Sequence, residues 1–122
     1  MNAKHGMLEG MDCLFCKIVA GEIPSKKLFE DEVAYAFADI APKAPVHALI
    51  VPKKHFASLT DTGPEEKTLL GHLHLVAKDL AREHGLANGY RVVINTGDDG
   101  GQTVSHLHLH LLGGRQMHWP PG

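Results

Sequence analysis

The sequence has no long apolar run and no excess of charge of one sign. None of its hydrophobic stretches approaches the length of a membrane span. Its formal net charge of −2 gives no basis for non-specific binding to nucleic acid or to acidic lipid. We therefore expect neither nucleic acid nor a membrane among the partners of this protein.

Cysteine is scarce, with two residues in a chain of 122. They form a Cys13-x-x-Cys16 pair, which in a reducing cytosol favours a metal-binding or redox role over a structural disulfide. Residues 1–10 lack the apolar core of a secretory signal and predict a loose polar tail. We expect a cytoplasmic protein in which this tail precedes a single domain over residues 11–122.

Aromatic residues are also few, at 6% of the chain, and Trp119 is the only tryptophan. It lies in a proline-rich end, where it would be exposed if nothing covered it. An exposed tryptophan predicts a docking contact, for example with a partner chain.

Histidine is the abundant residue, with ten in the chain, and three of them alternate with leucine from His106 to Leu112. Alternation with a period of two predicts a half-buried strand. The leucine face can enter a core, whereas neutral imidazoles need hydrogen-bond partners. At about 3.3 Å per residue, neighbouring imidazoles start roughly 6.6 Å apart. This row of histidines therefore predicts a functional site.

The rest of the pattern predicts an α+β fold with about five antiparallel strands, one long helix and a short N-terminal helix. Pro64 and two glutamates mark the start of the long helix, which should run to about His84. The short helix falls within residues 13–21 and ends at Gly21. The predicted strands cover residues 27–29, 33–40, 47–52, 90–95 and 106–112.

The histidine row has three interpretations: a solvated sheet face without a role, a metal site, or acid–base and nucleophilic chemistry. The preceding loop, Gly100 to Ser105, favours the third, because its backbone N–H groups and hydroxyls could hold an anion. An anion-holding loop beside a histidine nucleophile fits phosphoryl or nucleotidyl transfer.

The cysteine pair supplies half of a zinc site, and only histidines could complete it. His55 and His106 are the candidates. A thioredoxin-like redox role is disfavoured because the strand and helix order of that fold is absent. A pair of surface cysteines without a role is the remaining alternative.

Residues 106–112 match the His-φ-His-φ-His-φ-φ signature of the histidine triad (HIT) family. From about Asp12 onward the chain resembles the nucleotide-binding branch of that family. The matching segments are Phe37–Ile40, Ala44–His47, Gly100–Thr103 and Gly113–Gly122, which ends in Trp-Pro-Pro-Gly.

The resemblance implies a homodimer in which two sheets join, and a purine nucleoside phosphoramidase. Such an enzyme cleaves the P–N bond of adenosine phosphoramidates and also acts on aminoacyl adenylates. His108 resembles the nucleophile that forms a nucleotidyl-histidine intermediate, and His110 the residue that contacts the phosphate. His47 and His106 resemble supporting residues. Thr103 stands where the family often has serine, which keeps a hydroxyl near the leaving group.

The resemblance also implies a site for a purine nucleotide such as AMP and no organic cofactor. Asp39 resembles the acceptor of the ribose hydroxyls, and Trp119 could reach the partner's active site. The other expected nucleotide-binding residues are Phe15, Ile18, Phe37, Ile40 and Leu49 around the base, and Asn95, Gly101 and Gln102 beside the sugar and phosphate.

The cysteines resemble the zinc arrangement of some bacterial family members, with Cys13, Cys16, His55 and His106 as ligands. Zinc would then be structural, leaving His108 and His110 free for chemistry. Two other functions remain as alternatives. One is a non-catalytic nucleotide-binding or scaffold protein, and the other is a dinucleoside polyphosphate hydrolase.

Overall fold

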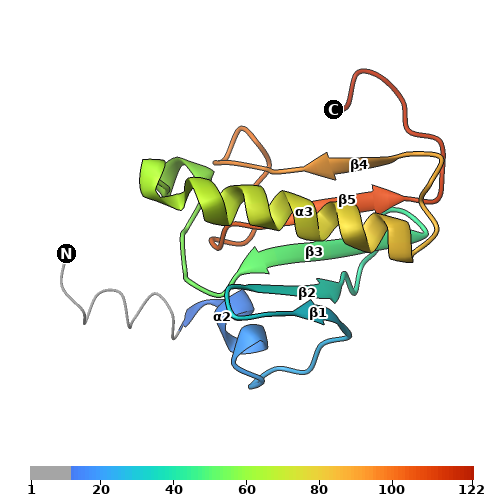
Figure 1. Ribbon diagram of the computed structural model, residues 1–122. Coiled ribbons are helices and arrows are strands. Elements are labelled where there is room, and N and C mark those ends of the chain that lie inside the picture. The colour runs from blue at the N-terminus through green and yellow to red at the C-terminus, as the bar shows by residue number, and fades with distance from the viewer. Residues whose placement is uncertain (1–11) are drawn as a thin grey trace.

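The computed structural model describes residues 12–122, so the tail predicted over residues 1–10 lies outside it, and a single domain over residues 11–122 stays a prediction. Two helices and one sheet form the fold (Figure 1). The helices are α2 (Leu14–Val19) and α3 (Lys67–Glu83), and the strands are β1 (Lys27–Glu30), β2 (Ala34–Ala38), β3 (Val46–Pro52), β4 (Tyr90–Val93) and β5 (Leu109–Gly113). The predicted α+β class is confirmed.

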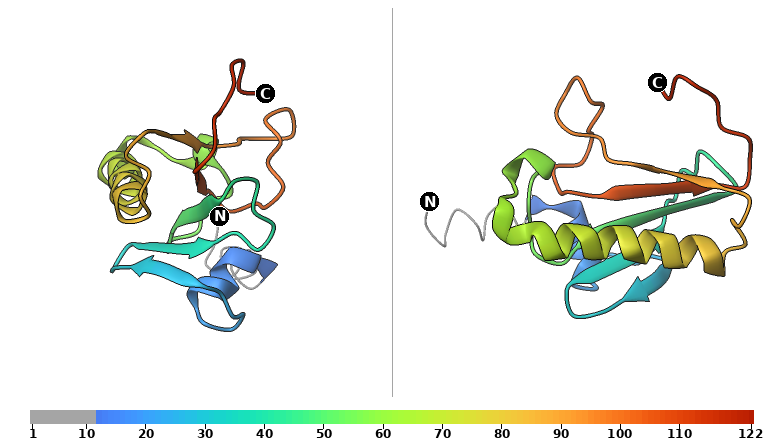
Figure 2. Two further views of the ribbon diagram at one scale, coloured as in Figure 1. Left: turned by 90° about the vertical axis from the view of Figure 1, so that its right-hand side faces the viewer. Right: turned by 45° about the horizontal axis from the view of Figure 1, so that its top comes forward.

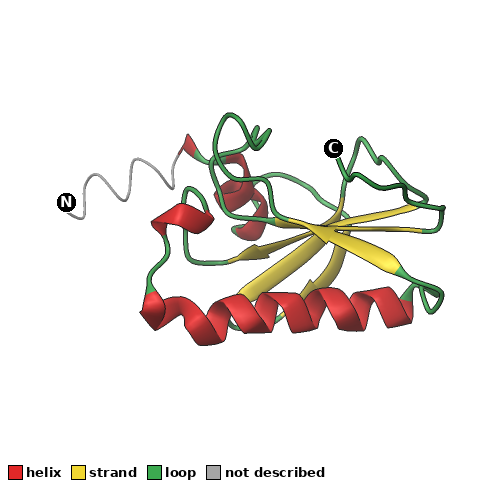
Figure 3. Cartoon of the chain, turned by 90° about the horizontal axis from the view of Figure 1, so that it is seen from above, coloured by secondary structure: helices red, strands yellow, loops and turns green. Residues whose placement is uncertain are grey.

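The five strands are all antiparallel and lie in the order β1-β2-β3-β5-β4. The long helix α3 packs along one face of this sheet (Figure 3). The short helix α2 packs on the opposite face, against β2 and β3 (Figure 2). No helix in the described part of the chain is long and apolar enough to cross a membrane.

Alternation along the strands divides the core into two layers. On β3, Ala48 and Ile50 face α3, whereas Leu49 and Val51 face α2. The α3 layer also contains Leu107, Leu109 and Leu111, as the leucine alternation predicts. The histidines that alternate with these leucines therefore lie on the α2 side of the sheet.

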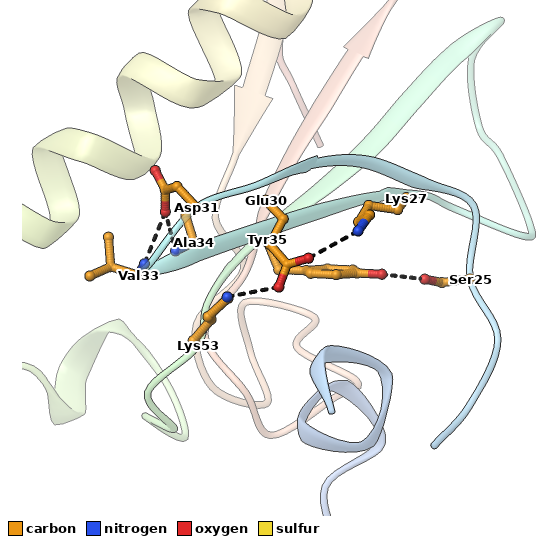
Figure 4. Close-up of polar contacts among 8 residues, drawn as sticks. All are labelled: Ser25, Lys27, Glu30, Asp31, Val33, Ala34, Tyr35 and Lys53. Atoms are coloured by element: carbon orange, nitrogen blue, oxygen red, sulfur yellow. Dashed lines mark hydrogen bonds and ion pairs between the residues drawn. The ribbon is translucent and has the colours of Figure 1, made fainter. Parts of the chain in front are cut away.

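The hairpin between β1 and β2 is closed by Asp31, whose Oδ1 accepts hydrogen bonds from the backbone N–H groups of Val33 and Ala34 (Figure 4). Glu30 forms ion pairs with Lys27 of the same strand and with Lys53, which follows β3. An aspartate bonding the backbone two and three residues ahead is a common way to fix a turn. This turn lies between the strands that the sequence predicts over residues 27–29 and 33–40.

The predicted strand over residues 106–112 is wrong in its first half, because β5 begins only at Leu109. The register pairs Ile50 with Leu109, so a longer ladder would place Pro52 opposite Leu107. Proline has no N–H to donate, and the Leu107 N–H instead donates to the carbonyl oxygen of Phe56 at 2.7 Å. His106 and His108 thus precede the strand, although the alternation of faces continues through them.

The other predicted boundaries need smaller changes. The strand predicted over residues 33–40 is shortened to β2, and the one predicted over residues 90–95 ends at Val93. The long helix begins with a 3₁₀ turn, Pro64–Glu66, in which the Glu66 carboxylate accepts the N–H of Gly63. This capping confirms the helix start that Pro64 and the glutamates predict.

Candidate functional site

The α2 side of the sheet carries two clusters of titratable side chains. We call Cys13, Cys16, His55 and His106 the Cys₂His₂ cluster, and Asp39, His47 and His110 the Asp-His-His cluster. Within each cluster, the potential ligand atoms lie within 4.8 Å of one another. His108 lies between the two clusters in the sequence, with its ring centroid 4.9 Å from that of His110.

The hydrogen bonds of His108 determine which of its nitrogens is free. Its Nδ1 lies 2.7 Å from the carbonyl oxygen of His106, and a carbonyl only accepts, so Nδ1 carries the proton. In the neutral ring, Nε2 therefore holds an unprotonated lone pair, and it has no hydrogen-bond partner among the described residues. A lone pair held on a buried imidazole is suited to act as a nucleophile.

A chain of hydrogen bonds sets the tautomers of the other two histidines. The backbone N–H of Lys43 donates to Nδ1 of His47 at 3.0 Å, so neutral His47 carries its proton on Nε2. That proton faces Nδ1 of His110 at 2.9 Å, which leaves the proton of neutral His110 on Nε2. The His110 Nε2 is buried without a partner in the described chain. An unpaired buried donor of this kind points to a missing acceptor, such as a phosphoryl oxygen.

Burial keeps these rings neutral. Desolvation, followed by the neighbouring His108 and His47, lowers the pKa of His110 to about 4, while Asp39 opposes the shift. Desolvation also lowers the pKa of His47 and of His108. At neutral pH the site therefore combines a lone pair on His108 with a neutral N–H donor on His110.

The Cys₂His₂ cluster has the geometry of a tetrahedral metal site. The Nδ1 of His106 lies 3.2 Å from Sγ of Cys13, 3.5 Å from Sγ of Cys16 and 3.1 Å from Nδ1 of His55. Zinc with bonds of about 2.0 Å to nitrogen and 2.3 Å to sulfur would space its ligands roughly 3.3–3.8 Å apart. The four residues could therefore hold a metal ion with little rearrangement.

The tautomer of His106 also suits a metal ligand. Its Nε2 lies 2.9 Å from the carbonyl oxygen of Pro52, so the proton is on Nε2 and the Nδ1 lone pair faces the cluster. Burial, followed by the neighbouring Cys13, raises the pKa of Cys16 to about 12. A divalent cation beside this thiol would instead favour the thiolate.

The same reasoning argues against metal in the Asp-His-His cluster. His47 can offer Nε2 to a metal only if that nitrogen loses its proton, and the Lys43 N–H already occupies Nδ1. His110 points Nδ1 at the His47 donor. This cluster is therefore a hydrogen-bond relay, with Oδ2 of Asp39 3.3 Å from Nε2 of His47.

The loop before His106 uses its polar groups differently from the sequence-based expectation. The N–H groups of Gly101 and Gln102 donate within the loop, to the carbonyl oxygens of Asp98 and Gly97. The side-chain amide of Gln102 donates to the carbonyl oxygens of Ala57 and Val104, and its oxygen accepts the N–H of Gly97. Gln102 thus fixes the shape of the loop.

The remaining predicted residues fall into a buried group and an exposed group. The buried group packs against the α2 side of the sheet: Phe15, Ile18, Phe37 and Leu49. Ile40 and Trp119 are 99% and 84% exposed in the single chain. Thr103 is exposed and Asn95 is half-buried. The roles predicted for all these residues remain predictions.

Comparison with known proteins identifies the family. The HIT domain family matches residues 20–117. This protein belongs to the HIT family. An uncharacterized HIT-like protein of Synechococcus elongatus is 54% identical over 111 residues, which cover 91% of this chain and 97% of the relative. The crystal structure of a HIT family hydrolase from Legionella pneumophila superposes with a TM-score of 0.89 at 54% identity, covering 91% of this chain and 100% of that one.

A histidine triad nucleotide-binding protein from Candida albicans has the same fold, with a TM-score of 0.76 at 38% identity over 89% of this chain and 83% of that one. The resemblance noted from residues 106–112 is thus confirmed at the level of the family.

Sequence reasoning missed the backbone groups that set the tautomers. These are the Lys43 N–H and the carbonyl oxygens of Pro52 and His106. It also missed Arg115, whose Nε donates to the carbonyl oxygen of Lys43 at 3.1 Å. Any residue type supplies backbone groups, so no sequence signal could have revealed the first three.

The neutral state of His110 can be measured directly. In a pH titration followed by NMR, we expect the His110 ring to protonate well below the ordinary histidine value of about 6.5, because its charged form is desolvated. Asp39→Asn should lower the midpoint further, since the carboxylate favours the protonated ring. A His110 midpoint at or above 6.5 would contradict the geometry described here.

Proposed function

We propose that this protein is a nucleotide-binding hydrolase that cleaves the P–N bond of purine nucleoside phosphoramidates, including adenosine phosphoramidates, and also acts on aminoacyl adenylates. The main support for this proposal is the fixed tautomer of His108, which holds an Nε2 lone pair beside the unpaired Nε2–H of His110. Two proteins of similar structure, a HIT family hydrolase and a histidine triad nucleotide-binding protein, support this class.

The reaction has two displacements at the α-phosphorus. The His108 Nε2 lone pair forms a bond to phosphorus while the P–N bond to the amine breaks, and the amine takes that electron pair and a proton from solvent. Water then attacks phosphorus, the bond to Nε2 breaks, and the electron pair returns to the ring. The water gives up one proton, which balances the proton taken by the amine.

Each displacement needs charge stabilisation that the neighbouring groups supply. When phosphorus is bound to Nε2, the ring of His108 is positive, and the His106 carbonyl oxygen accepts its Nδ1–H. The Nε2–H of His110 donates to the phosphoryl oxygen, where negative charge develops. The Thr103 hydroxyl assists the leaving amine.

The nucleotide lies on the α2 side of the sheet in this proposal. Phe15 and Phe37 stand edge to face at 5.4 Å and, with Ile18, Ile40 and Leu49, form the wall for the base. Asp39 accepts the ribose hydroxyls, and Asn95 and the loop at Gly101 and Gln102 lie beside the sugar and phosphate.

Turnover of a fluorogenic adenosine phosphoramidate tests the proposal. His108→Asn should lower kcat by about 10³-fold or more, the scale expected when a covalent nucleophile is lost. His74→Asn is the matched control, because His74 is exposed on α3 and bonds only the Leu70 carbonyl oxygen of its own helix. AMP affinity should change little in both variants.

An unchanged rate in His108→Asn would contradict the mechanism. AMP binding without any phosphoramidate turnover would favour a scaffold role, and faster turnover of a dinucleoside polyphosphate in a parallel assay would favour the other hydrolase class.

Zinc is the ion we propose for the Cys₂His₂ cluster, in a structural role. Two thiolates and two imidazoles are the donor set of many structural zinc sites. The hydrogen bond from His106 to the Pro52 carbonyl oxygen is the kind of support that orients a metal-bound histidine. A cytoplasmic location, which we also propose, keeps both thiols reduced for this role.

Elemental analysis of the purified protein tests the metal proposal. We expect about one zinc per chain in the parent, because all four ligands are in place, and much less after His55→Gln. His72→Gln is the matched control, since His72 contacts Asp31 outside the cluster and should leave the zinc content unchanged. A zinc content near zero in the folded parent protein would contradict the zinc proposal.

A homodimer that joins two sheets completes the proposal, with β4 as the joining edge. The opposite edge, β1, carries an irregular register and the ion pair between Lys27 and Glu30, features that oppose edge-to-edge pairing. The β4 edge instead begins with Tyr90, which is 43% exposed. The partner's Trp119 would then cover the nucleotide.

Sedimentation tests the dimer. The parent should have twice the chain mass of 13.2 kDa. Tyr90→Lys should shift the protein towards the monomer, because it places like charges near the joined edges, whereas Glu30→Lys on β1 should not. A monomeric parent at micromolar concentration would contradict this part of the proposal.

A further inference from the structure

The segment that carries His108 is not held by the strand ladder. Because β5 begins at Leu109, residues 106–108 lack the regular pairing that fixes the rest of the strand. The Leu107 N–H donates to the Phe56 carbonyl oxygen at 2.7 Å, and His106 Nε2 donates to the Pro52 carbonyl oxygen at 2.9 Å. Both acceptors lie in the segment from Pro52 to Phe56, which contains His55 of the Cys₂His₂ cluster.

His106 belongs to the metal cluster through its ring and to the reaction site through its backbone. Its Nδ1 faces the two thiols and His55, while its carbonyl oxygen accepts the Nδ1–H of His108. If the His106 peptide shifted, His108 would lose the acceptor that selects its tautomer. The other neutral tautomer has its proton on Nε2 and cannot attack phosphorus.

Phe15 makes a second connection. It lies between Cys13 and Cys16 on α2, and its ring meets the rings of His106 and His108 edge to face, at 6.0 and 5.1 Å. A cation that binds both cysteines would also fix the helix turn that presses Phe15 against His108.

We propose that the Cys₂His₂ cluster, with its cation bound, is a positioning device for the nucleophile. Binding holds the His106 ring, and thereby the carbonyl oxygen that keeps the proton of His108 on Nδ1. This inference rests on the proposed roles of His108 and of the cluster. Two thiolates neutralise a divalent cation, so the coupling acts through geometry rather than through charge.

The test observes the tautomer itself in the full-length protein labelled with ¹⁵N. Long-range ¹H–¹⁵N spectra of the zinc-loaded protein should show one His108 tautomer, with the proton on Nδ1. After the zinc is removed with a chelator, both tautomers should appear, and exchange of the Leu107 amide should accelerate by about tenfold, which corresponds to 1.4 kcal/mol. Amides in the ladder of β3 and β5 should keep their exchange rates, and added zinc should restore the first spectrum.

Two variants distinguish the loss of a fixed His108 tautomer from a general loss of stability. Cys13→Ser/Cys16→Ser should reproduce the chelated state even when zinc is supplied. Val92 lies on β4 and packs in the core layer on the α3 side of the sheet, so Val92→Ala should lower stability without changing the His108 tautomer. If the chelated chain unfolds, His55→Gln provides the comparison, since it removes one part-exposed ligand and keeps both thiols and His106.

The inference is overturned if the folded, zinc-free protein keeps a single Nδ1–H tautomer and an unchanged Leu107 exchange rate. This readout needs no substrate, so it is independent of the proposed activity. A zinc-dependent tautomer in a protein without phosphoramidate turnover would reject the proposed function and retain the positioning role. Phosphoramidate turnover with a zinc-independent His108 tautomer would reject the positioning role and retain the proposed function.

Discussion

In the proposed mechanism, the chemistry of this site depends on the hydrogen bond from His108 to the carbonyl oxygen of His106. Imidazole has two nearly equivalent nitrogens, and in water the proton moves between them. The 2.7 Å contact removes that equivalence. A carbonyl oxygen does not titrate near neutral pH, so the preference it imposes is stable wherever the ring is neutral. Burial then keeps the ring neutral by lowering its pKa.

Backbone groups also fix the tautomers of His106 and His47, and in both rings the proton is on Nε2 rather than on Nδ1. A backbone carbonyl oxygen fixes the proton of His106 on Nε2, and a backbone N–H fixes that of His47 on Nε2 as well, by occupying its Nδ1. For His106 the consequence is a free Nδ1 that faces two thiols. For His47 it is a donor that faces His110. Single backbone groups thus give the two clusters different properties. One presents a lone pair to two thiols, and the other presents a donor to a histidine.

The sequence predicts the parts of this arrangement that depend on side-chain pattern. The leucines at 107, 109 and 111 identify the core face, and the histidines between them identify the site face. It does not predict where β5 begins, because that depends on Pro52 lying opposite Leu107, a register set only by the folded sheet. Nor does it predict that the Gln102 amide donates to backbone carbonyl oxygens that hold the loop. An amide in a glycine-rich segment looks equally suited to bind a phosphate.

The late start of β5 leaves residues 106–108 without regular strand pairing. A regular strand would fix residues 106–108 by its own ladder, and a metal site there would add little to their order. Because the proline in β3 ends the pairing, the segment needs another anchor, and the Cys₂His₂ cluster and the Phe56 carbonyl oxygen lie where the ladder would have continued. Because Pro52 interrupts one set of backbone contacts, we infer that the order of the segment before β5 depends on side chains at the start of α2 and in the segment after β3.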